Sequence, residues 1–142
     1  MFQPSRDDVR RFFAEAWRKR RDAMPATPLE TIAGDWIAEH PEHHPELADL
    51  EAALAAPASG TGDGPNPFLH LSMHLSISEQ VSIDQPPGIR AACERLAAKL
   101  GSMHAAQHAA MECLGTMLWE SQRSGRPPDG DAYLACVSRR AG

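Results

Sequence analysis

Long apolar runs are absent from this chain of 142 residues, and their absence argues against several classes of protein. No stretch approaches the roughly 20 consecutive apolar residues that a membrane-spanning helix needs. The N-terminal stretch Met-Phe-Gln-Pro-Ser-Arg-Asp-Asp carries acidic side chains where a secretion signal needs apolar ones. We therefore expect a cytoplasmic protein that does not enter the membrane.

Cysteines are few, and familiar catalytic motifs are missing. Cys93, Cys113 and Cys136 form no Cys-x-x-Cys pair and are odd in number. This pattern favours a reduced protein with small buried thiols. The sequence also has no His-Glu-x-x-His motif, which argues against a zinc protease of that type, and no glycine-rich phosphate loop.

The chain is acidic overall, but basic side chains are concentrated near its N-terminus. The net charge of -5 argues against a general nucleic-acid binder. Basic side chains nevertheless crowd the N-terminal region, at Arg6, Arg10, Arg11, Arg18, Lys19, Arg20 and Arg21. A solvated helix face is the ordinary explanation of such a run. The alternative is a patch that binds phosphate or an acidic protein partner, and substitutions of Arg10, Arg18 and Arg21 would then impair capture of the partner.

Apolar residues recur with helical periodicity, and no stretch alternates as a strand does. Helices are predicted over residues 5–22, 28–40, 41–55, 67–84, 88–100, 102–123 and 130–139. In the third of these, Leu47, Leu50 and Leu54 are the expected buried positions. A loop rich in glycine and proline follows at 56–66. The sequence therefore predicts one all-α domain over residues 1–142, a bundle of about five to seven helices.

Local signals mark where several of these helices begin and end. Ser5 and Ser102 are good N-terminal caps, and Gly101 suits the end of the helix before Ser102. Thr27 and Glu30 have the spacing of a capping box, with proline at the first helical position.

Histidine pairs at helical spacing are the main chemical feature. His70 and His74 are four residues apart on one predicted helix, and His104, His108 and Glu112 repeat that spacing on another. Residues four apart share a helical face. Neutral imidazole commonly binds zinc and iron, and helical bundles build dinuclear sites from inward-facing ligands. We predict a site for iron, manganese or zinc whose ligands are His70, His74, His104, His108 and Glu112.

Other ligands and another class of function stay open. His40 and His44 are also four apart, but Pro41 interrupts the helix between them. Glu79 lies about 140° around a regular helix from His74, which favours a surface carboxylate. A dinuclear iron or manganese site would support redox chemistry, and a zinc ion would support hydrolysis or a structural role. Without a metal, the histidines would form a buried polar network in a non-catalytic interaction module.

The central block of the chain resembles a known family. Residues 66–90 read Asn-Pro-Phe-Leu-His-Leu-Ser-Met-His-Leu-Ser-Ile-Ser-Glu-Gln-Val-Ser-Ile-Asp-Gln-Pro-Pro-Gly-Ile-Arg. This block, with His-Ala-Ala-Gln-His at 104–108 and Gly-Arg-Pro-Pro-Asp-Gly at 125–130, resembles the bacterial domain-of-unknown-function family numbered 1841. The resemblance covers nearly the whole chain and implies a small cytoplasmic bacterial protein, with no activity attached. The ligand spacings are also similar to those of haemerythrin-like di-iron bundles, whose motifs follow a different order.

Overall fold

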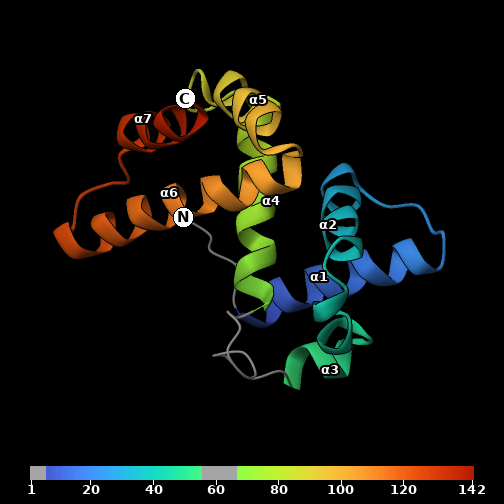
Figure 1. Ribbon diagram of the computed structural model, residues 1–142. Helices are drawn as coiled ribbons and strands as arrows, with labels where there is room; N and C mark the ends of the chain where they lie inside the picture. The colour runs from blue at the N-terminus through green and yellow to red at the C-terminus, as the bar shows by residue number, and fades with distance from the viewer. Residues whose placement is uncertain (1–5, 56–66) are drawn as a thin grey trace. The chain divides into compact units, whose positions relative to one another are not determined.

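The computed structural model describes residues 6–55 and 67–142. These residues form seven α-helices and two 3₁₀ helices, with no strand among them (Figure 1). The predicted all-α class is therefore confirmed. No described helix has the length and apolar character needed to cross a bilayer. The chain falls into two compact units, Met1–Leu75 and Ser76–Gly142, and the prediction of a single domain stays a prediction.

The first unit is built from helices on either side of two proline-initiated turns. It contains α1 (Arg6–Arg21), α2 (Pro28–Ala38), η1 (Pro41–His43), η2 (Pro45–Leu47), α3 (Leu50–Ala55) and the first part of α4 (Pro67–Ile83). The predicted capping box begins α2: the Glu30 amide donates to the Thr27 hydroxyl at 3.1 Å, and the Thr27 amide donates to the Glu30 carboxylate at 2.9 Å. The predicted cap Ser5 lies outside the described residues.

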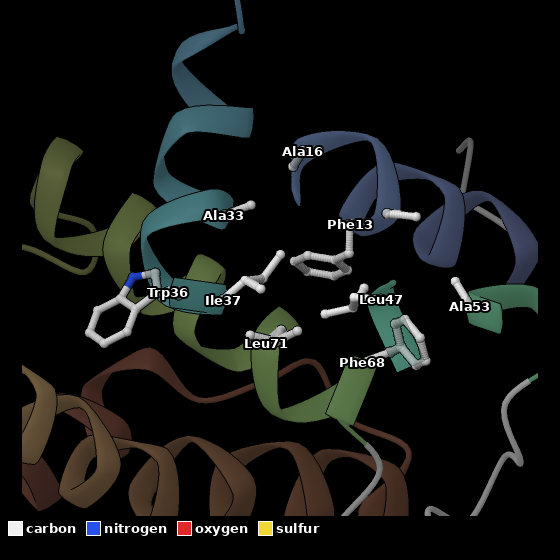
Figure 2. Close-up of a cluster of buried hydrophobic side chains, with 10 residues drawn as sticks. Phe13, Ala16, Ala33, Trp36, Ile37, Leu47, Ala53, Phe68 and Leu71 are labelled. Carbon is white, nitrogen blue, oxygen red and sulfur yellow. The ribbon is translucent and has the colours of Figure 1, made fainter. Parts of the chain in front are cut away.

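An apolar core holds the first unit together. Phe13 of α1, Ile37 of α2, Leu47 of η2 and Leu71 of α4 point toward one another in Figure 2. Each of these side chains is at most 1% exposed. Burying one such side chain contributes roughly 1.5–3 kcal/mol to the free energy of unfolding. The core therefore fixes the end of α2 against the start of α4, where histidines from both segments occur.

The region 41–55 is not the single helix that the sequence predicts. Pro41 and Pro45 each begin a 3₁₀ turn, and α3 starts only after them. Proline lacks an N–H and fits the first turn of a helix but not its interior. The break changes which residues are buried: Leu50, expected in the core, is 40% exposed, and Ala53 is buried instead.

The second unit consists of the remainder of α4 with α5 (Ile89–Leu100), α6 (Met103–Ser124) and α7 (Gly130–Ala141). Helix α5 packs against α6 and α7, which also contact each other. The predicted helix ends are confirmed. Ser102 caps α6 by accepting a hydrogen bond from the Ala105 amide at 3.0 Å, and Gly101 ends α5 with a φ of 97°. The buried side chains of this unit include Ile77, Ile89, Leu96, Leu114, Tyr133 and Val137.

The cysteines differ from the predicted set of three reduced thiols. Cys113 of α6 and Cys136 of α7 form a disulfide, with their Cα atoms 5.8 Å apart. Cys93 of α5 is free and fully buried, and burial raises the pKa of its thiol to about 11. The two joined cysteines are 23 residues apart in no short motif, so only the packing of their helices reveals the pair.

Candidate metal centre

Three imidazoles of the first unit converge through their Nε2 atoms. His40 follows the end of α2, and His70 and His74 lie one turn apart on α4. The Nε2 atom of His40 lies 3.1 Å from Nε2 of His70 and 3.3 Å from Nε2 of His74. His40 and His74 are buried, and His70 is partly exposed. The four-residue spacing of His70 and His74 thus places both rings beside His40.

The tautomer of His40 is fixed by the backbone. Its Nδ1 atom lies 2.7 Å from the carbonyl oxygen of Trp36. Because a carbonyl oxygen can only accept, Nδ1 carries the proton, and Nε2 of the neutral ring keeps a lone pair. Histidines that bind metals commonly donate their other N–H to a carbonyl in this way. The ring of His40 is therefore oriented with its Nε2 lone pair toward His70 and His74.

The two distances from the Nε2 atom of His40 fit a shared metal ion. The single lone pair of His40 Nε2 accepts one well-aligned hydrogen bond, yet two imidazole nitrogens approach it. Around a tetrahedral zinc ion with Zn–N bonds of about 2.0–2.1 Å, neighbouring ligand nitrogens lie roughly 3.3 Å apart. Both distances from His40 are close to that value. The donor set is therefore suited to one shared cation.

Trp36 holds two of the three imidazoles. Its carbonyl oxygen orients His40, and its indole ring stacks on the ring of His74 with centroids 3.9 Å apart and planes inclined by 14°. The His70 and His74 ring centroids are 4.8 Å apart and nearly perpendicular, at 80°. Packing and hydrogen bonding thus restrict the ring planes before any ion is bound.

Glu42 and Glu46 act electrostatically on His43, whose ring lies beside the histidine cluster. The Oε2 atom of Glu46 is buried, and no described residue donates a hydrogen bond to it. The ring of His43 lies 5.6 Å from those of His40 and His70. Burial lowers the pKa of His43, although Glu42 and Glu46 act in the opposite direction. A buried carboxylate oxygen without a donor is costly, and a cation in its neighbourhood would offset that cost.

Two of the predicted ligands in the second unit, His104 and His108, contact each other. The ring centroids of His104 and His108 are 4.4 Å apart, and each ring offers a nitrogen within 4.8 Å of one on the other. His104 is half-buried and His108 is exposed. Glu112, also on α6, is exposed, and its carboxylate pairs with the guanidinium of Arg140. The assignment of these three residues as ligands stays a prediction.

His40, His44 and Glu79, which sequence analysis left undecided as metal ligands, lie in different environments. His40 lies at the centre of the cluster, whereas the Nε2 atom of His44 lies 2.8 Å from the Ile37 carbonyl oxygen and donates to it. Glu79 is exposed on α4. The spacing of His40 and His44 carried little information on its own, because Pro41 breaks the helix between them. Side chains at a helix end still point back along the helix, and Trp36 lies four residues before His40, which was the available signal.

Arg10 is part of the core and not of the basic surface. It is 2% exposed, its guanidinium donates to the Ala53 carbonyl oxygen at 2.8 Å, and it lies 4.5 Å from the centre of the Phe68 ring. Lys19 binds the Glu30 carboxylate at 2.8 Å. These two cations therefore stabilise the first unit, and docking of a partner on the other basic residues stays a prediction.

The chain belongs to the family described as domain of unknown function DUF1841, whose sequence profile matches residues 5–139. The resemblance noted in the central block is thereby confirmed. No curated protein and no solved structure matches the chain. Because the family description assigns no activity, a function has to be argued from the residues themselves.

Proposed function

We propose that the first unit binds a divalent transition-metal ion, with zinc as the preferred ion, through the Nε2 atoms of His40, His70 and His74. One observation carries the proposal: two imidazole nitrogens lie 3.1 and 3.3 Å from the Nε2 atom of His40, whose proton is fixed on the opposite ring nitrogen. Three neutral nitrogens suit zinc, copper or nickel, whereas manganese and dinuclear iron sites rely on carboxylates.

The number of protein ligands decides what such an ion would do. Three histidines and an open fourth position are the pattern of catalytic zinc, which activates water for hydrolysis or polarises a carbonyl group. A fourth protein ligand would close the site and make it structural. His104 and His108 are our predicted further ligands, and they provide the means of separating the two roles.

Zinc affinity of single variants tests the proposal. We expect His40→Ala and His70→Ala to weaken binding roughly a hundredfold or more, measured by competition with a chromophoric chelator. His44→Gln is the matched control, because the Nε2 atom of His44 donates to the Ile37 carbonyl oxygen. Circular dichroism would verify folding, and the partly exposed His70 provides the variant that disturbs the core less. Wild-type affinity in both folded ligand variants would refute the assignment.

A second pair of variants determines whether the site is open. If His104 and His108 are ligands, His104→Ala and His108→Ala should each weaken zinc binding to a similar extent. Unchanged affinity in both would assign an open three-histidine site, and X-ray absorption spectroscopy would count the nitrogens bound to zinc. A folded wild-type protein without measurable affinity for zinc, iron or copper would instead favour the interaction module.

A further inference from the structure

A pocket of about 750 Å³ lies between α6 and α7 in the second unit, and the Cys113–Cys136 disulfide forms part of its wall. This volume is within the range of small-molecule sites. Cys113 is 1% exposed, whereas Cys136 is partly exposed. Cys136 is therefore the more accessible of the two cysteines that line the pocket.

The charged groups around the pocket favour an anion. Its cationic side chains are Arg123, Arg126 and Arg139. Both acidic side chains of the wall are engaged: Glu120 binds Arg123 at 2.7 Å, and Asp129 caps α7 by accepting from the Ala132 amide at 3.0 Å. Among the described residues no carboxylate forms an ion pair with Arg126 or Arg139. The guanidinium groups of Arg126 and Arg139 can therefore bind a carboxylate, sulfonate or phosphate group in the pocket.

We propose that this pocket binds a small anionic thiol, which exchanges with the Cys113–Cys136 disulfide. The ligand thiolate attacks Sγ of Cys136, the bond to Cys113 breaks, and the Cys113 sulfur leaves with the electron pair and is protonated from solvent. A second thiolate attacks the ligand sulfur of this mixed disulfide and releases Cys136. The sum is two ligand thiols oxidised to their disulfide and one protein disulfide reduced to two thiols.

The arginines would act on binding and not on the sulfur chemistry itself. Arg126 and Arg139 hold the anionic end of the thiol, and this raises its concentration beside Cys136. A disulfide that only links α6 to α7 would react with thiols according to their thiolate content, without regard to the charge at the other end. This difference separates an exchange site from a structural cross-link. The proposal does not depend on the metal centre of the first unit.

Three thiols of similar size that differ in charge provide the experiment: mercaptoethanesulfonate, mercaptoethanol and cysteamine. The oxidised full-length protein is mixed with each thiol, and mixed-disulfide formation is followed by intact mass spectrometry, with rates corrected for thiolate content. Peptide mapping locates the adduct. Cys93, which is buried and has a pKa of about 11, should not react.

We expect the anionic thiol to react at Cys136 at least about tenfold faster than the neutral one, with a rate that saturates at high concentration. Arg126→Gln and Arg139→Gln should remove this preference and leave the rate with mercaptoethanol unchanged. Arg95→Gln, on the exposed surface of α5 and outside the pocket, is the control. Equal corrected rates for the three thiols, an adduct elsewhere, or a disulfide that resists all three in the folded protein would each overturn the proposal.

Discussion

The carbonyl oxygen of Trp36 lies 2.7 Å from Nδ1 of His40, while the indole ring of the same residue stacks at 3.9 Å on the ring of His74. One residue of α2 thus orients an imidazole from the end of its own helix and an imidazole from α4. Because the hydrogen bond leaves the His40 lone pair on Nε2, the nitrogen that faces His70 and His74 is the one able to bind a cation.

This contact predicts a spectroscopic signal of metal binding. Cobalt(II) is a substitute for zinc whose unpaired electrons quench the fluorescence of a nearby indole. We expect cobalt to quench the protein's tryptophan fluorescence in proportion to occupancy, and Trp36→Phe to lose most of that quenching while it still binds cobalt. Trp119, 58% exposed on α6, provides the control variant Trp119→Phe. Undiminished quenching in Trp36→Phe would place the ion away from this ring.

The buried guanidinium of Arg10 predicts a large effect on stability. Replacing Arg10 by Met leaves the Ala53 carbonyl oxygen without its donor and removes the cation from the Phe68 ring. We expect the free energy of unfolding to fall by about 2–3 kcal/mol, measured by urea denaturation. Arg11→Met, an exposed neighbour on the same helix, should change it by less than about 0.5 kcal/mol. Equal effects of the two variants would contradict the core role of Arg10.

Glu30 predicts a stability difference that depends on pH. The hydrogen bond from Lys19 is the main cause that lowers the pKa of Glu30 in the folded protein. A carboxyl group whose pKa is lower in the folded protein than in the unfolded chain stabilises the fold at pH values above the unfolded-state pKa, about 4.3. This stabilisation is lost as the pH falls through the pKa of the folded state. Glu30→Gln should therefore cost about 1 kcal/mol at neutral pH and progressively less below about pH 4. Urea denaturation across this range measures it.

The control for Glu30 is Glu51→Gln, an exposed glutamate in the first turn of α3. Its effect on the free energy of unfolding should be small at every pH. A Glu30→Gln difference that stays constant down to the acid limit would show that the ion pair with Lys19 does not produce it.

Helix boundaries were predictable because their causes are local. The Thr27 capping box, the Ser102 cap and the prolines at the starts of α2 and α4 act within a few residues, and α2, α4 and α6 begin close to the predicted positions. The burial of Arg10 was also present in the pattern, since Arg10 shares the helical face of Phe13 and Ala14. We did not predict this burial because a charged arginine side chain is rarely buried in a core.

Features that depend on packing between distant segments were not predictable. The spacing of His70 and His74 indicated one shared face, but only the core contacts of the first unit bring His40 to their Nε2 atoms. The Cys113–Cys136 disulfide likewise requires α6 and α7 to lie together. Neither pairing leaves a periodic trace in the sequence, because the partners belong to different helices.

Metal content of the untagged protein is the decisive measurement, because an affinity tag of histidines would itself bind metal. The protein would be purified without chelators and analysed by plasma mass spectrometry, in parallel with His40→Ala. We predict close to one zinc ion per wild-type chain and little in the variant. A folded wild-type protein that contains no transition metal and takes up none from added zinc would contradict the proposed site, and the converging histidines would then be a buried polar network.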